Sequence, residues 1–120
     1  MTSERLQQSQ NEILRLVKAV DNSSRLRILY SLYGEPRGFQ DIKDVAGLEK
    51  SALSSHLKLL MDADLVDKYQ HGVYRITVTG RELLEALEAV HDGMNERRHE
   101  AQQGAIRRQI TESFLKRARR

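Results

Sequence analysis

The chain has 120 residues, a length that suits one small domain with an added helical arm. Lys and Arg number 20 against 17 Asp and Glu, so the net charge of +3 at pH 7 only mildly favours contact with polyanions. The absence of cysteine excludes disulfides, thiolate metal sites and cysteine nucleophiles, and it suits a reducing, cytoplasmic location.

Apolar residues at helical spacing predict the first two helices. The first stripe follows the polar residues 3–10 and comprises Ile13, Leu14, Leu16, Val17 and Val20. Residues 21–24 interrupt this stripe and offer side chains that can cap the next helix. The second helix carries Leu26, Ile28, Leu29 and Leu32. Two glycines and the only proline then predict a loop over residues 34–38.

A short helix, a tight turn and a longer helix are predicted next. The short helix covers residues 39–46. In the turn after it, Gly47 tolerates a positive φ and Leu48 can fill the space. Its inner face is Phe39, Ile42 and either Val45 or Ala46. The longer helix begins at residue 49 or 50 and ends at residue 64. Its apolar stripe is Leu53, Leu57, Leu60 and Leu65.

The apolar pattern then changes from helical spacing to alternation. Residues 66–70 alternate, and residues 73–78 are rich in β-branched and aromatic side chains, so the two segments predict a β-hairpin with its turn at His71 and Gly72. Thr79 and Glu82 follow at the spacing of a capping box, in which each side chain accepts a hydrogen bond from a free backbone N–H. This pair predicts the start of the last helix.

The last helix carries two apolar stripes. The first is close to a heptad pattern and predicts a dimer interface formed by Leu83, Leu87, Val90 and Met94, because a monomer would expose this apolar surface to water. The second stripe is in a different phase and comprises Ile106, Ile110 and Phe114. The sequence leaves two possibilities for this segment. It can form one continuous helix over residues 80–120, about 60 Å long, or a helix broken near Gly93 or Gly104.

This order of elements points to double-stranded DNA as a partner. Three helices and a hairpin can enclose one core and leave the outer face of the helix from residue 50 exposed, and a helix fits the major groove. The candidate DNA contacts on that face are Lys50, Ser51, Ser54, Ser55 and Lys58. Lys68 and Arg75 are candidate phosphate ligands on the hairpin, whereas His56 is expected to pack at the edge of the core.

Three segments carry a resemblance to ArsR-type winged helix-turn-helix regulators. Residues 22–29 resemble the opening helix of that family, and residues 39–66 resemble its helix-turn-helix, with the sequence LSSHLKLL at 53–60. Residues 74–84 resemble the second wing strand and the helix after it. The resemblance implies a homodimer that binds an inverted repeat through residues near Lys50, Ser51, Ser54 and Ser55.

The chain also departs from this family pattern. Asp64 stands where such regulators usually have glycine, and the paired cysteines of many metal-binding members are absent. The long basic C-terminal arm is similar to that of small archaeal winged-helix regulators, which dimerise through an extended helix.

The fold class predicted from these patterns is mainly α with a small β-hairpin (α+β), a winged helix-turn-helix with extended N- and C-terminal helices. Residues 1–20 are expected to form a helix that supports the dimer, and residues 21–79 a DNA-binding domain. Residues 80–120 are expected to form the dimerisation helix or helices, with a basic end. No stretch is long and apolar enough to cross a membrane, so a cytoplasmic, nucleoid-associated protein is expected.

The predicted function is a dimeric transcriptional regulator that acts as a repressor. Enzyme activity is not expected, because no glycine-rich phosphate loop, nucleophile elbow or metal-hydrolase spacing is present. Two alternatives stay open. The basic residues of 105–120 suit an architectural chromatin protein of low specificity, and winged helices also serve as protein-interaction modules.

No cofactor is expected, although the last helix holds several residues that can bind a metal. Glu88 with His91, or Glu96 with His99 or Glu100, can face each other, whereas the adjacent His91 and Asp92 are not expected to. Solvated ion pairs explain these charges equally well. A metal or ligand effector therefore stays open without support from the sequence.

Overall fold

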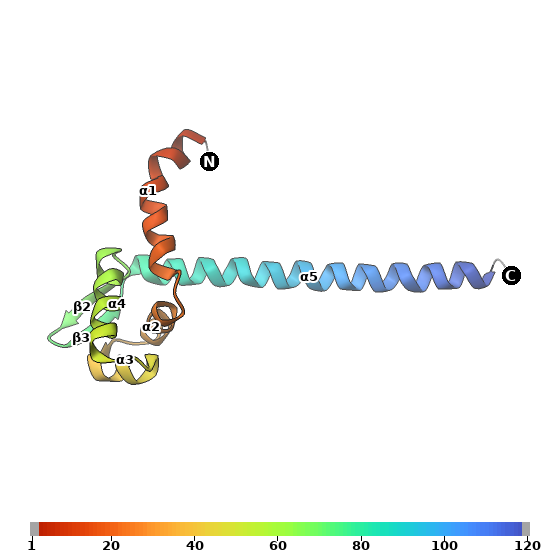
Figure 1. The fold of residues 1–120 in the computed structure, drawn as a ribbon. Helices are drawn as coiled ribbons and strands as arrows, with labels where there is room; N and C mark the ends of the chain where they lie inside the picture. Colours follow the sequence, from red (N-terminus) through yellow and green to blue (C-terminus); the bar gives the residue numbers. More distant parts are fainter. Residues whose placement is uncertain (1–2, 119–120) are drawn as a thin grey trace. The chain divides into compact units, whose positions relative to one another are not determined.

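The computed structural model describes residues 3–118, which form five helices and three short strands (Figure 1). The elements are α1 (Ser3–Val20), α2 (Ser23–Tyr33), β1 (Arg37–Gly38), α3 (Phe39–Ala46), α4 (Lys50–Asp62), β2 (Val66–Gln70), β3 (Val73–Ile76) and α5 (Val78–Ala118). The predicted fold class, mainly α with a winged helix-turn-helix, is confirmed. Two compact units divide the chain, one up to Leu84 and the other from Glu85.

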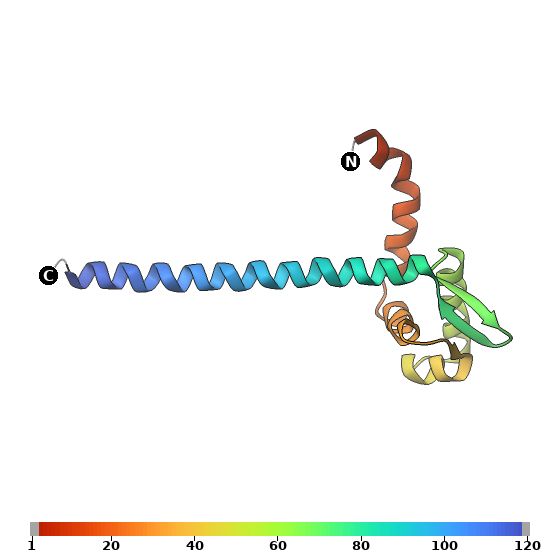
Figure 2. The ribbon, with the colours of Figure 1, turned by 180° about the vertical axis from the view of Figure 1, so that it is seen from behind.

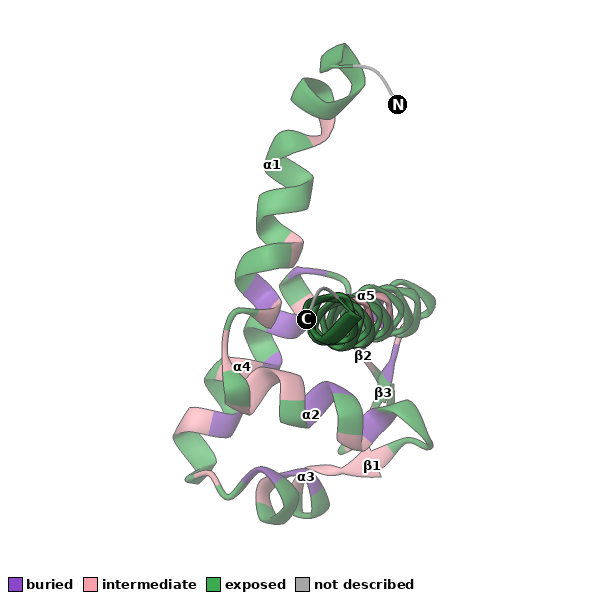
Figure 3. Cartoon of the chain, turned by 90° about the vertical axis from the view of Figure 1, so that its right-hand side faces the viewer, coloured by how far each residue is buried: buried purple, intermediate pink, exposed green. Residues whose placement is uncertain are grey.

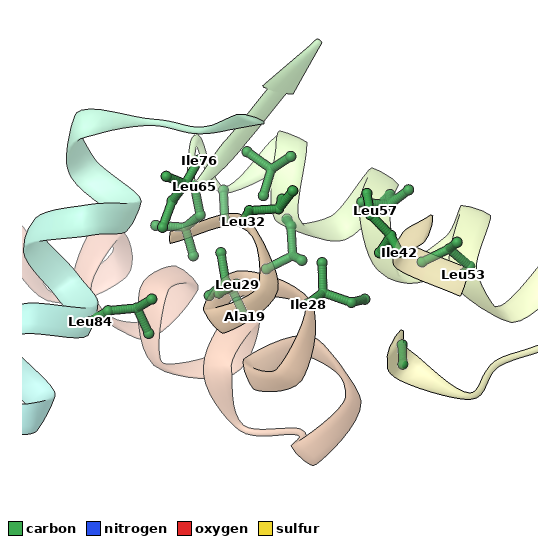
Figure 4. Close-up of a cluster of buried hydrophobic side chains, with 14 residues drawn as sticks. Ala19, Ile28, Leu29, Leu32, Ile42, Leu53, Leu57, Leu65, Ile76 and Leu84 are labelled. Carbon is green, nitrogen blue, oxygen red and sulfur yellow. The ribbon is translucent and has the colours of Figure 1, made fainter. Parts of the chain in front are cut away.

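The hydrophobic core of the first unit lies between α2, α3, α4 and the start of the hairpin (Figure 4). Its fully buried large side chains are Ile28, Leu29, Leu32, Ile42, Leu53, Leu57, Leu60, Leu65, Val66 and Leu84. Burial of each such side chain contributes about 1.5–3 kcal/mol, so the predicted stripes of these helices account for the packing. Of the two residues left open on α3, Ala46 is buried and Val45 is exposed.

The helix ends follow the capping chemistry of the sequence, with one exception. Asn22 caps α2, because its Oδ1 accepts a hydrogen bond of 3.0 Å from the backbone N–H of Arg25. Gly47 ends α3 in the left-handed region at φ 64°, as predicted. The cap of α5 is Thr77, whose Oγ1 accepts a hydrogen bond of 3.0 Å from the N–H of Gly80. The predicted capping box of Thr79 and Glu82 is therefore wrong.

Asp64 takes the backbone conformation that glycine usually supplies after this helix. The helix α4 ends at Asp62, two residues earlier than predicted, and Asp64 has φ 61°. The hydroxyl of Thr77 donates a hydrogen bond of 2.7 Å to the carbonyl oxygen of Asp64. Thr77 thus joins the turn after α4 to the start of α5.

The sheet is antiparallel, with strand order β1–β3–β2. Its outer strand β1 lies in the segment 34–38, which the sequence predicted as a loop, and pairs Arg37 with Tyr74 and Gly38 with Val73. The Nε–H of Arg37 also donates a hydrogen bond of 2.5 Å to the carbonyl oxygen of Ser31. This strand fixes the end of α2 against the hairpin of β2 and β3, which we call the wing.

Gly80 is required where α5 begins, because the helix passes very close to the backbone of Leu65. A Cβ atom at position 80 would lie 2.4 Å from the carbonyl oxygen of Leu65 and 2.8 Å from a side-chain carbon of Ile76. The same carbonyl oxygen accepts a hydrogen bond of 3.0 Å from the N–H of Thr77. The backbone hydrogen bond between Thr77 and Leu65 therefore holds the start of α5 close to Leu65.

The last helix is continuous. Gly93 and Gly104 both lie inside α5, so the broken helix that the sequence left open is not observed (Figure 2). The second unit consists of this helix from Glu85 onward, and its residues up to Ala118 are exposed or half-buried (Figure 3). Within residues 3–118, no helix has both the length and the apolarity needed to cross a membrane.

Candidate nucleic-acid interface

The outer side of α4 presents all five of its predicted DNA contacts to solvent. Leu53, Leu57 and Leu60 turn into the core, with at most 1% of their surface exposed. At about 100° per residue, the five polar contact residues of α4 occupy an arc of about 140° that begins beside this buried stripe. The residues of this α4 face are Lys50, Ser51, Ser54, Ser55 and Lys58, and all of them are exposed.

Two acidic residues, Glu49 and Asp62, stand at the ends of α4. Glu49 is the N-cap residue and makes no side-chain capping hydrogen bond, so it does not occupy the free N–H groups of the first turn. Asp62 is exposed at the other end of the helix and lies within the arc of the α4 face. The positive charge of the face is therefore concentrated between Lys50 and Lys58.

The two predicted phosphate ligands of the wing lie on opposite faces of the hairpin. Lys68 pairs with Tyr74 in the strand register, whereas Arg75 pairs with Asp67. Side chains alternate between the two faces of a strand, so Arg75 and Lys68 point to different sides. Both residues are exposed, but the structure does not bring them together.

Arg75 is held by two neighbours on its face of the wing. Its Nε–H donates a hydrogen bond of 2.7 Å to Oδ1 of Asp67, and the side chains are 48% and 45% exposed. Its guanidinium carbon lies 5.2 Å from the centroid of the Tyr69 ring. The hydrogen bond and the charge of Asp67 raise the pKa of Arg75 above its ordinary value.

His56 is half-buried and lies against Arg25, as expected for a histidine at the edge of the core. Its Nδ1 is 3.1 Å from a terminal nitrogen of Arg25. Burial, and then the charge of Arg25, lower the pKa of His56. Arg25 also donates hydrogen bonds to the carbonyl oxygens of Ala19, at 2.7 Å, and Lys18, at 3.0 Å. Arg25 thereby connects the end of α1 to α4, a role that sequence reasoning missed.

The predicted dimer residues differ in their surroundings. Leu83 packs partly against the core of the first unit. Leu87, Val90 and Met94 are 39%, 61% and 38% exposed. We call these three residues the proximal stripe of α5.

Ile106, Ile110 and Phe114 form a distal stripe and are 52%, 64% and 70% exposed. Val90 and Ile110 are 20 positions apart, which corresponds to a rotation of about 200° around the helix. The two stripes therefore face nearly opposite sides of α5, and one straight partner helix cannot cover both.

Of the residues that the sequence singled out as metal ligands, three approach one another. The ligand atoms of Glu88, His91 and Asp92 lie within 4.8 Å of one another, and all three residues are exposed. The expectation that His91 and Asp92 do not face each other is wrong, because Nδ1 of His91 lies 3.8 Å from Oδ1 of Asp92. Rotation of two exposed side chains on one turn allows this contact. Exposed groups of this kind are common on helices, so we assign no metal to them.

The basic end of the chain lies on α5 as far as residue 118. Arg107, Arg108, Lys116 and Arg117 are all exposed there. Arg119 and Arg120, which belong to the same predicted segment, lie outside the described residues.

Comparison with known protein families identifies the segment that holds the α4 face. Residues 22–68, from the cap of α2 into β2, match the family described as "Bacterial regulatory protein, arsR family". An uncharacterised HTH-type transcriptional regulator of Methanocaldococcus jannaschii is 30% identical over 56 residues, which is 47% of this chain. The match spans 59% of that relative's own length.

Solved structures show the same architecture. The homodimeric winged helix-turn-helix DNA-binding domain of a possible ArsR-family regulator from Mycobacterium bovis has a TM-score of 0.68 and 27% identity, over 80% of this chain and 93% of its own. NolR from Sinorhizobium fredii has a TM-score of 0.63 and 26% identity, over 75% of this chain and 93% of its own. The predicted resemblance to ArsR-type regulators, rather than to enzymes, is confirmed.

Proposed function

We propose that this chain, whose residues 22–68 form an ArsR-family helix-turn-helix domain, is a homodimeric DNA-binding transcriptional regulator that acts as a repressor. The observation that carries the proposal is the α4 face, where three hydroxyls and two ammonium groups stand exposed on one side of a helix. Such a regulator would work on the nucleoid, in the cytoplasm.

In the proposed complex, α4 lies in the major groove of B-DNA. Lys50 and Ser51 contact phosphates together with the free N–H groups of the first helical turn, which favour anions. Ser54 and Ser55 are short enough to let the helix approach base edges, where a hydroxyl can donate or accept a hydrogen bond. Lys58 and the wing residues Lys68 and Arg75 hold the DNA backbone on either side.

The homodimer is proposed to form through α5. The relative from Mycobacterium bovis is described as homodimeric, and the exposed proximal stripe supplies an apolar surface for a second copy. Leu83 would contribute at the edge of this surface. A two-fold dimer presents two copies of α4 and therefore suits an inverted repeat, with half-sites about 34–36 Å apart.

The division of labour along the chain follows from this arrangement. Residues 1–20 would support the dimer, residues 21–79 would bind DNA, and residues 80–120 would hold the two copies together. The basic residues near the end of α5 would add phosphate contacts that do not depend on base sequence.

Fluorescence anisotropy tests the proposal. The protein is titrated onto labelled DNA from upstream of its own gene and onto a scrambled duplex of equal length, across a salt series. We expect the native duplex to bind at least about a thousandfold more tightly, as specific regulators do. If neither duplex binds at low salt, the proposal is wrong, and a protein-interaction module becomes the better explanation.

An architectural chromatin protein is the second candidate, and the basic end of α5 favours it. Such a protein would bind both duplexes alike, with a steep dependence on salt. The same titration therefore separates the two candidates.

A further inference from the structure

We propose that Tyr69 and Asp67 are positioning residues that hold Arg75 ready for a DNA phosphate. The inference rests on the proposed function and adds two residues to the site. Neither residue was among the predicted DNA contacts, and Asp67 carries a charge that DNA repels.

The geometry of Arg75 supports this role. At one edge of the guanidinium, Nε–H donates a hydrogen bond of 2.7 Å to Oδ1 of Asp67. The central carbon of the group lies 5.2 Å from the centroid of the Tyr69 ring. These contacts leave both terminal Nη amines without a protein partner within residues 3–118. Arginine binds a phosphate through such amines, and a guanidinium that is already oriented loses less rotamer freedom when it does so.

The position of the three residues also fits a DNA contact. Arg75 and Tyr69 are exposed on the strands β3 and β2, which form the wing after the helix-turn-helix (Figure 1). An exposed ion pair of this kind contributes little to folding, so stability alone does not explain the cluster. A side chain that must meet a ligand gains from being ordered in advance.

A bulge in the hairpin creates this arrangement. Gln70 pairs with Val73 across the turn, and continuing that register without interruption would set Lys68 opposite Arg75. The irregularity between Lys68 and Gln70 shifts the pairing by one residue, so Asp67 stands opposite Arg75 instead. The bulge thus replaces a repulsive pair of cations with a supporting carboxylate.

The test compares two substitutions of Tyr69 that leave the net charge unchanged. Tyr69→Phe keeps the aromatic ring, and Tyr69→Leu removes it. Binding to a random-sequence duplex is measured by anisotropy across a salt series, because a phosphate contact does not need the operator. We expect Tyr69→Phe to match the wild type and Tyr69→Leu to bind about two- to fivefold more weakly, the size of an exposed cation–π interaction.

A double-mutant cycle shows whether Tyr69 acts through Arg75. Arg75→Gln should lower the slope of log affinity against log salt by about 0.9, as expected for the loss of one phosphate contact. In this background, Tyr69→Leu should have no further effect. Asp67→Ala should likewise change affinity by different factors in the two backgrounds. Circular dichroism melts confirm that each variant folds.

The outcomes separate this inference from the proposed function. If the wild type binds no DNA at low salt, both are overturned. If the wild type binds but Tyr69→Leu equals Tyr69→Phe, only the inference is overturned. An equal loss from Tyr69→Leu in both backgrounds would also overturn it, because Tyr69 would then contact DNA itself.

Discussion

His56 on α4 and Arg25 on α2 are in direct contact, with Nδ1 of the histidine 3.1 Å from a terminal nitrogen of the arginine. Arg25 also binds two carbonyl oxygens at the end of α1, so one side chain joins three helices. The contact needs an unprotonated Nδ1, because a protonated imidazole cannot accept a hydrogen bond and would repel the guanidinium.

We expect the free energy of unfolding to fall as the pH drops below about 6.5, the ordinary pKa of histidine. The pKa of His56 is lowered in the folded state, so the unfolded chain takes up the proton first and gains stability relative to the folded chain. Urea denaturation at pH 7.5 and 5.5 measures the effect. His56→Gln should lose less stability than the wild type between these two pH values. Equal losses would show that His56 does not contribute.

We expect Gly80→Ala to destabilise the first unit by about 1–3 kcal/mol, the usual cost of overpacking. The new Cβ would meet the backbone oxygen of Leu65, which cannot move aside as a flexible side chain can. Gly104→Ala is the control, because its nearest neighbour is the end of the Arg108 side chain at 4.0 Å. All four tyrosines lie before Leu84, so their fluorescence reports on the first unit. A stable Gly80→Ala variant would contradict the close contact.

Substitutions of Asp64 should rank in stability as Gly, Asp and then Ala. The left-handed φ of 61° is easy for glycine, tolerable for aspartate and strained for alanine. The span from Gly to Ala should be about 1–2 kcal/mol, reduced by the greater freedom of glycine in the unfolded chain. Thermal melts at pH 7 measure it. Alanine as stable as glycine would show that the turn relaxes.

We expect the double substitution Leu87→Glu and Val90→Glu to halve the mass measured by light scattering and to weaken DNA binding. It places charges in the proximal stripe, where the second copy is proposed to pack. Gln102→Glu with Gln103→Glu is the control, since it adds the same charge to the same helix. If both variants keep the mass of the wild type, the proximal stripe is not the dimer interface.

Changes on the α4 face should separate affinity from specificity. Ser54→Ala with Ser55→Ala should reduce the preference for the native duplex, because each lost hydroxyl–base hydrogen bond costs about 0.5–1.5 kcal/mol. Lys50→Gln should weaken binding to native and scrambled duplexes alike and lower the salt slope by about 0.9. Arg98→Gln changes the net charge equally on the second unit and serves as the control. An unchanged preference after the serine substitutions would place base readout elsewhere.

Apolar spacing predicted the buried faces of α2 and α4 well, but not that of α1, where Ile13, Leu14 and Val17 are exposed and the only buried residue is Ala19. Leu53, Leu57 and Leu60 repeat every three or four residues, and the structure buries all three. The glycine at the end of α3 was equally readable, because few other residues adopt φ 64° without strain. The side of α4 that stays exposed followed directly from these assignments.

Features that depend on residues far away in the sequence could not be predicted from it. The strand β1 has two residues, and its partner β3 lies more than 30 positions away, so no local pattern indicates it. Arg25 and His56 are 31 positions apart. Thr77 and Thr79 both stand near the start of α5, and only the carbonyl oxygen of Asp64 shows which hydroxyl is fixed. The partner of Arg75 depended on a bulge that changes the hairpin register by one residue.

The second unit of the chain is a helix without a buried side chain between Glu85 and Ala118. In proteins most of the stability of a helix comes from packing against a partner, so under the proposed dimer this helix gains its stability from a second copy and hence depends on protomer concentration. Operator occupancy would then rise more steeply than in proportion to the number of chains in the cell. Under this proposal, dilution by growth would release the operator over a narrow range of copy number, and this helix would set the threshold.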